Sequence, residues 1–117
     1  MGFKFEKLMV WQKAIDLSCE IHALTRFFPK EELYILSSQI KRASDSISLN
    51  IAEGSTGQTD PEQRKFLAYA IRSALEVISC LYIGNKRGLI TKAVFDDLYD
   101  RTETIVKMLQ ALRNSLN

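Results

Sequence analysis

The sequence predicts an all-α protein that folds as an antiparallel, up-down-up-down four-helix bundle. Apolar residues recur at steps of three and four along four long segments, which is the spacing of one helix face. Only five glycines and two prolines interrupt the 117 residues, and most of them fall between these segments. No stretch alternates polar and apolar residues as a strand does. The connections are short, so consecutive helices are expected to run antiparallel.

The first predicted helix covers roughly residues 8–27. Pro29 ends it, because proline lacks a backbone donor and pushes the preceding residue out of helical dihedrals. The residues that line one face of this helix are Trp11, Ala14, Ile15, Ser18, Ile21, His22 and Thr25, with Leu17, Leu24 and Phe28 widening it. A short exposed arm, which packs on a neighbour or on its own chain, is expected upstream at Phe3, Phe5, Leu8 and Val10.

The second predicted helix begins between Lys30 and Ser37. It ends in residues 54–57, where two glycines can adopt the left-handed conformation that closes a helix. Its apolar residues follow one another at steps of three or four, as in the seam of a bundle. They are Leu33, Leu36, Ile40, Ala43, Ile47 and Ile51.

The third predicted helix has the clearest start in the chain. Asp60 is the expected N-cap, Pro61 the first helical residue and Gln63 the capping-box residue. The helix is expected to run to about Asn85, and Thr91 is expected to cap the fourth helix. The seam residues are Phe66, Leu67, Ala70, Ala74, Val77, Ile78 and Leu81 in the third helix, and Phe95, Leu98, Thr102, Ile105, Leu109, Leu112 and Leu116 in the fourth.

Length and composition predict a single domain over residues 1–117. A hydrophobic share of 46%, a charged share of 26% and a net charge of +2 exclude disordered, collagen-like and histone-like proteins. Cys19 and Cys80 lie in helical patterns without a CxxC motif, which is typical of reduced, buried thiols in a cytosol. We find neither a signal peptide nor an apolar stretch approaching 18 residues, so we expect a cytoplasmic protein without a membrane partner.

Side chains that enzymes and metal sites use are scarce, which predicts a protein that is not an enzyme and has no metal, cofactor or catalytic residue. His22, the only histidine, is expected to pack or cap. A di-iron bundle needs a Glu-x-x-His pair on each of two helices, and the chain has neither pair. The acidic residues at the start of the fourth helix are expected to face water, namely Asp96, Asp97, Asp100 and Glu103.

Several short strings go beyond helical periodicity. They are residues 8–14 (LMVWQKA), 28–33 (FPKEEL), 39–43 (QIKRA), 46–47 (SI) and 50–54 (NIAEG). In this order and spacing the chain resembles, over nearly its whole length, the bacterial four-helix-bundle family named after intervening sequences in 23S ribosomal RNA genes, also called the S23 ribosomal protein family. It differs from the expected family pattern at Gly57-Gln58, where a basic residue is frequent, and at Arg72, where glycine is expected.

The resemblance implies a small cytoplasmic bundle that assembles into a ring-shaped homopentamer. It also implies kinship with the accessory variability determinant proteins of diversity-generating retroelements, which are basic pentamers that bind nucleic acid and a reverse transcriptase. Self-association, RNA or DNA, and a protein such as a reverse transcriptase are therefore the expected partners.

A polar stripe lies beside the apolar seam of the second predicted helix. It consists of Gln39, Arg42, Ser46, Asn50 and Glu53. One interpretation is that this polar stripe simply faces water. The other, which the resemblance favours, is a contact between subunits or against the third helix, where Arg42 and Glu53 meet partners such as Glu76 or Arg72 and fix the register. Trp11 is a second candidate contact, because an aromatic ring with one donor suits a half-buried position, although plain core is equally compatible with it.

Basic side chains are the candidate contacts for nucleic acid, namely Lys41, Arg64, Lys65, Arg72, Lys86 and Arg87. Residues 54–88 carry five basic and three acidic side chains, so the whole net charge of +2 falls around the third helix. A ring of five copies would repeat this charge and bind phosphates through counterion release. No aromatic residue interleaves with the basic pairs, as single-strand binding sites usually require.

The predicted function is that of a non-catalytic oligomeric scaffold or accessory protein that binds RNA or DNA through the basic surface of the assembled ring. The alternative is a protein–protein interaction module with no nucleic-acid ligand.

Overall fold

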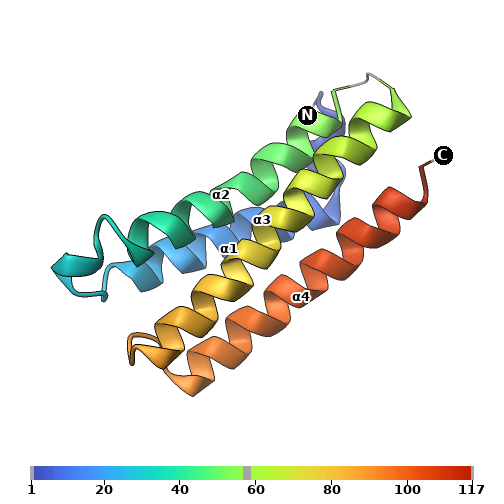
Figure 1. The fold of residues 1–117 in the computed structure, drawn as a ribbon. Coiled ribbons are helices and arrows are strands. Elements are labelled where there is room, and N and C mark those ends of the chain that lie inside the picture. Colours follow the sequence, from blue (N-terminus) through green and yellow to red (C-terminus); the bar gives the residue numbers. More distant parts are fainter. Residues whose placement is uncertain (1, 57–58, 117) are drawn as a thin grey trace.

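The computed structural model describes residues 2–56 and 59–116. The helices are α1 (Met9–Thr25), α2 (Leu36–Gly54), α3 (Asp60–Lys86) and α4 (Lys92–Asn114), with short 3-10 helices at Lys4–Lys7 and Lys30–Glu32 (Figure 1). The described residues contain no strand. The predicted all-α class is therefore confirmed, and the four helix positions agree with the predicted segments to within a few residues. The start of α2 at Leu36 lies inside the predicted range from Lys30 to Ser37.

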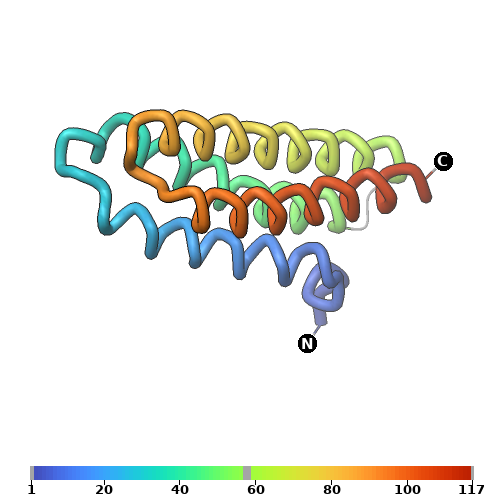
Figure 2. Tube along the Cα trace, turned by 90° about the horizontal axis from the view of Figure 1, so that it is seen from below, coloured from blue at the N-terminus to red at the C-terminus, as the bar shows by residue number. Residues whose placement is uncertain are grey.

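Consecutive helices run in opposite directions, and the two chain ends lie at the same end of an elongated bundle of about 43 × 22 × 21 Å (Figures 1 and 2). Each helix packs on the next along the chain, and α1 also contacts α4. This is the predicted up-down-up-down bundle.

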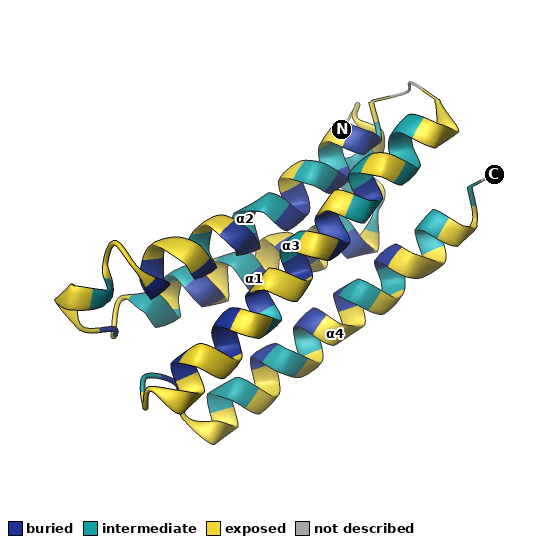
Figure 3. Cartoon of the chain, viewed as in Figure 1, coloured by how far each residue is buried: buried dark blue, intermediate teal, exposed yellow. Residues whose placement is uncertain are grey.

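The core runs the length of the bundle along one stripe of each helix (Figure 3). The predicted seam of α2 is buried from Leu36 onward, but Leu33 is exposed because it lies before the helix begins. In α3 and α4 the buried residues are Leu67, Ala70, Ile71, Ala74, Val77, Cys80, Leu81 and Gly84, and Leu98, Thr102, Ile105 and Leu109.

The buried face of α1 agrees with the predicted one at Ala14, Leu17 and Ile21 and differs from it at Val10 and Ile15. Val10, Ala14, Leu17 and Ile21 form its buried row, whereas Ile15 is exposed. The prediction that Val10 belongs to an exposed arm is wrong, because it lies one turn before Ala14 on the face that meets the other helices.

The helix ends are set by residues close to the predicted ones. The N-cap of α3 is Thr59 rather than Asp60, and its hydroxyl accepts a hydrogen bond from the Glu62 N–H at 3.3 Å. Thr91 caps α4 as predicted, accepting from the Val94 N–H at 3.3 Å. The sequence predicts that the second helix ends in residues 54–57. Of these, Gly57 lies outside the described residues, and so does the following Gln58.

The turn between α3 and α4 shows why a glycine is needed there. Gly88 has a φ of 75°, in the left-handed region that favours glycine. Its N–H donates to the Asn85 carbonyl at 3.1 Å, and the Leu89 N–H donates to the Gly84 carbonyl at 2.8 Å. These two bonds satisfy carbonyls that the end of α3 would otherwise leave open. Gly84 itself is helical, and α3 ends at Lys86, one residue beyond the predicted end near Asn85.

α3 is long enough and apolar enough to cross a membrane by those two criteria, with an 18-residue window of mean hydropathy 1.5. The sequence-based expectation that no stretch approaches this length of apolar chain is therefore too simple. Core helices of bundles meet the same criteria, and 39% of this window is buried inside the bundle.

Gly54 marks a close approach between α2 and α3. A Cβ atom at this position would lie 2.8 Å from the Phe66 Cβ and 3.4 Å from the Gln63 carbonyl oxygen. The substitution Gly54→Ala is therefore expected to lower the free energy of unfolding by about 1–3 kcal/mol, because the two helices must separate. Gly2→Ala, where nothing lies within 4 Å, is the matched control and should change it by less than about 0.5 kcal/mol. Chemical denaturation of both variants measures the free energy of unfolding. An unchanged value for Gly54→Ala would contradict the close packing of α2 on α3.

Candidate functional site

The polar stripe of α2 lies along its border with α3, where side chains of both helices form two hydrogen-bonded groups. In the first, Arg42 Nη2 donates to Gln39 Oε1 at 2.6 Å and lies 3.8 Å from Glu76 Oε2. The predicted partner Glu76 therefore does meet Arg42. The Arg42 side chain is 69% exposed and that of Glu76 45%, so within one chain this ion pair contributes little stability.

The second group joins the two helices through hydroxyls. Ser73 Oγ donates to Ser46 Oγ at 2.9 Å, and Asn50 Nδ2 donates to the same oxygen at 3.0 Å and to the Ser46 carbonyl at 2.9 Å. Ser46 and Asn50 are half-buried. Ser73 is not among the residues that the sequence predicted to take part.

The end of the stripe does not form the predicted contact. Glu53 is exposed, and no ion pair between Glu53 and Arg72 is found in the described part of the chain. Arg72 instead lies over the ring of Tyr69, with its guanidinium carbon 6.0 Å from the ring centre. The expected Glu53–Arg72 pairing is absent because of the antiparallel register of the two helices: Ser73 lies opposite Ser46, which places Arg72 about two turns from the level of Glu53.

An apolar surface adjoins the stripe on the outer side of α2. It consists of Leu33, Tyr34 and Leu49, and with Lys41 and Arg42 it lines a surface cavity of about 780 Å³. Tyr34 is 89% exposed and Leu49 67%. The sequence did not reveal this surface, because the path of the connection before α2 decides that Leu33 and Tyr34 line the same cavity as Leu49. We call these three residues the apolar surface of α2.

Trp11 is half-buried and anchors the N-terminal arm to its own chain. The centres of the Trp11 and Phe5 rings lie 5.0 Å apart in an edge-to-face arrangement, and the Phe5 ring stacks on that of Phe3. Gln12 Nε2 donates to the Glu6 carbonyl at 2.8 Å. Of the two expectations for the arm, packing on its own chain is the one observed here.

The candidate basic residues do not form one patch. Arg64 and Lys65 lie near the start of α3, whereas Lys86 and Arg87 lie at its other end, about 33 Å away for 22 residues at about 1.5 Å per residue. Lys65 Nζ is 3.0 Å from Glu62, and this hydrogen bond together with the Glu62 charge raises the pKa of Lys65. Arg87 pairs with Glu32 at 3.3 Å. Two of the six cations are therefore already partly neutralised.

The remaining candidates differ in their surroundings. Arg64 is half-buried, and its Nη1 atom has no hydrogen-bond partner within residues 2–56 and 59–116. Lys41 is half-buried on α2 and borders two surface cavities. Arg72 and Lys86 are exposed.

A serine, a histidine and an aspartate meet between α1 and α2. Ser18 Oγ donates to Asp45 Oδ1 at 2.5 Å, and His22 Nε2 lies 2.9 Å from the same oxygen. In a hydrolase triad the serine hydrogen bonds to the histidine, which activates it. Here both bind the aspartate, so the serine is not activated and the group links the two helices. The predicted packing role of His22 is thus replaced by a hydrogen bond at a half-exposed position.

The two cysteines have different environments. Cys80 is buried, and burial raises the pKa of its thiol, with a smaller contribution from the charge of Glu76. Cys19 is exposed, so the expectation of two buried thiols is wrong for Cys19. Its helical position points away from the row of Ala14, Leu17 and Ile21.

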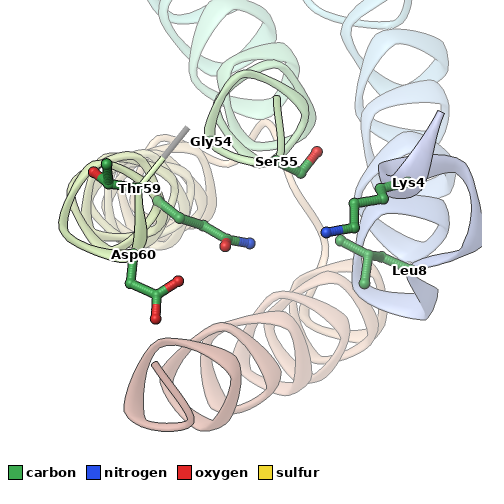
Figure 4. Close-up of a pocket in the computed structure, with 7 residues that line it drawn as sticks. Lys4, Leu8, Gly54, Ser55, Thr59 and Asp60 are labelled. Atoms are coloured by element: carbon green, nitrogen blue, oxygen red, sulfur yellow. The ribbon is translucent and has the colours of Figure 1, made fainter. Parts of the chain in front are cut away.

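Neither metal chemistry nor a charged ligand is indicated at the bundle end near the termini. No cluster of three metal-binding side chains is found among the described residues. A cavity of about 410 Å³ is lined there by Lys4, Leu8, Ser55, Asp60 and Gln63 (Figure 4). Its one cation and one anion give it no preference for a ligand of either charge.

Comparison with known proteins identifies the family. The model of the family described as 23S rRNA-intervening sequence protein matches residues 6–111. This chain belongs to that family. The intervening sequence protein fold is also found in a crystal structure of a protein with unknown function from the S23 ribosomal protein family of Bacteroides thetaiotaomicron VPI-5482. The two chains are 24% identical, with a TM-score of 0.84 over 90% of this chain and 98% of that one. No curated protein matches the chain significantly.

The two thiols provide a direct check of the helix orientations in this family member. Cys19 is expected to react with iodoacetamide at neutral pH, whereas Cys80 should react at least about tenfold more slowly, because it is buried and its raised pKa keeps the thiol protonated. Mass spectrometry of the folded protein measures the two rates. Cys19→Ser should remove the fast reaction, and both thiols should react in denaturant. A fast reaction that persists in Cys19→Ser would contradict the burial of Cys80.

Proposed function

We propose that this protein is a non-catalytic scaffold or accessory protein of the bacterial cytoplasm that assembles into a ring of five copies and binds RNA or DNA through the ring's basic surface. The subunit number and the nucleic-acid ligand follow the resemblance to the pentameric accessory proteins. Assembly is also supported by one observation in this chain, the apolar surface of α2.

The apolar surface of α2 is unusual for an isolated bundle. Leu33 and Tyr34 lie just before α2 and Leu49 lies more than three turns along it, and all three are exposed on one groove that Ser38, Lys41, Arg42, Asp45 and Ser46 also line. Large exposed apolar side chains on a groove with a polar surround are typical of an interaction site. They adjoin Arg42, whose ion pair with Glu76 gains strength only if a neighbour excludes water from it. A second copy seated here would cover the apolar side chains and bury the stripe at the same time. This is the combination of apolar centre and polar rim that protein interfaces show.

The charge distribution supports the nucleic-acid part. Five copies of a chain with net charge +2 carry +10, and in each copy Arg72 and Lys86 are exposed on α3 without a carboxylate partner in the described residues. A repeated set of such cations binds phosphates by releasing counterions. Contacts of this kind position a nucleic acid without reading its bases, so binding should tolerate many sequences.

Assembly is tested by light scattering over a range of protein concentrations. A ring of five has a mass of about 67 kDa, five times 13.4 kDa. Tyr34→Ser and Leu49→Ser together are expected to shift the mass toward the monomer, because they remove most of the apolar surface. Met9→Ser, which alters an exposed apolar residue at the start of α1, is the control and should keep the wild-type mass. A wild-type monomer at high concentration would contradict the proposed assembly.

Nucleic-acid binding is tested with a fluorescent single-stranded RNA probe at about 50 mM salt and above. The dissociation constant should rise steeply with salt, and the double substitution Arg72→Ala with Lys86→Ala should weaken binding at least about tenfold and flatten the salt dependence. Lys92→Ala is the control, because Lys92 already pairs with Asp96 at 2.8 Å. If an assembled ring binds neither RNA nor DNA at low salt, the protein is an interaction module with protein partners only.

A further inference from the structure

A cavity of about 330 Å³ lies between the last turn of α1 and the first turns of α2. It is enclosed by the connection between the two helices, which projects beyond the α3–α4 turn at that end of the bundle (Figure 2). Arg26 comes from the end of α1, Lys30 from the connection, and Ser37 and Lys41 from α2. Three separate elements therefore direct polar side chains to one cavity.

The charge of this cavity is uniformly positive. Arg26, Lys30 and Lys41 line it, and no carboxylate does. The closest acidic residues in the connection and in α2 are engaged elsewhere, Glu32 with Arg87 at 3.3 Å and Asp45 with His22 at 2.9 Å.

Glu31 follows Lys30 in the sequence but is exposed and does not line the cavity. Three like charges around one space repel one another, so an anion placed among them is favoured.

Ser37 gives the cavity a buried hydrogen-bonding group. Ser37 is 3% exposed, and it lines the cavity. A hydroxyl in the wall of a cavity can donate a hydrogen bond to a ligand oxygen. Ser37 is also the second residue of α2, whose N-cap residue Ile35 offers no side-chain hydrogen bond. The first turn of a helix carries partial positive charge, but Glu32 Oε1 already accepts from the Leu36 N–H at 3.4 Å, so the positive charge of the cavity comes from the three cations.

We infer that this cavity binds a phosphate group, with Arg26, Lys30 and Lys41 as its counter-charges and the Ser37 hydroxyl as a buried donor. A phosphate fits better than a carboxylate, because its oxygens point in several directions and can reach donors on three elements at once. His22 also borders the cavity, but its Nε2 is already bonded to Asp45, so it is not part of the ligand set. The site lies within one copy and requires neither the ring nor a nucleic acid.

The test compares thermal unfolding in sodium phosphate and in sodium chloride at equal ionic strength. Phosphate should raise the Tm of the wild-type protein in a saturable way, since a ligand that binds only the folded state stabilises it. Lys41→Met and Ser37→Ala should each raise the apparent Kd for phosphate about tenfold. In chloride alone, Ser37→Ala should unfold close to the wild-type Tm, because alanine keeps the buried Cβ atom, and this separates a binding role from a structural one.

Lys107→Met is the matched control, because Lys107 lies on α4 and pairs with Glu103 at 3.9 Å. Its apparent Kd for phosphate should stay within about twofold of wild type. No stabilisation by phosphate beyond that by chloride would overturn the inference. An equal loss in Lys107→Met and Lys41→Met would also overturn it.

A second arm distinguishes the source of the phosphate. If Lys41→Met also weakens binding of a single-stranded oligonucleotide by about tenfold, the bound group belongs to a nucleic-acid backbone. If the oligonucleotide affinity is unchanged while phosphate binding is lost, the ligand is a small phosphorylated molecule. Either result supports a phosphate site. Failure of the proposed function would show itself separately, as a monomer that binds no oligonucleotide while phosphate still raises its Tm.

Discussion

The close packing of α2 on α3 is the constraint on which the other features of this protein depend. Small residues allow it: Ala43, Ala70 and Ala74 are fully or almost fully buried, and Gly54 lies so near Phe66 that a Cβ atom would clash. At this short separation even serine side chains reach across, as Ser46 and Ser73 do. The distance between the two helices therefore determines which polar groups can pair along their border.

The same packing leaves the opposite side of α2 uncovered. Its apolar seam is used against α1 and α3, so Leu49 and the preceding Leu33 and Tyr34 have no partner helix within the chain. The polar stripe lies between the buried seam and this apolar surface. A helix with two apolar sides and a polar border is suited to join one copy to another, since each side meets a different neighbour.

The candidate site was predictable only in part. The spacing of Gln39, Arg42, Ser46 and Asn50 fixed their common helix face, because helical periodicity is a local property. The Arg42–Glu76 contact followed from placing α2 beside α3, but the suggested Glu53–Arg72 contact does not form, since it depends on the axial register of the two helices. The basic residues of α3 looked like one group in the sequence and are spread over its length in the structure, and the cavity near Ser37 depends on the path of an irregular connection.

The amino-acid order by itself determined the helix number, the antiparallel arrangement and most of the core, because apolar spacing, caps and turn glycines act within a few residues of one another. The tertiary structure alone decided that Val10 is buried and Ile15 exposed in α1, that Thr59 rather than Asp60 caps α3, and that Ser18 and His22 share Asp45. It also brought Arg26, Lys30 and Lys41 around one cavity. These outcomes depend on contacts between distant segments, whose geometry no local pattern of residues specifies.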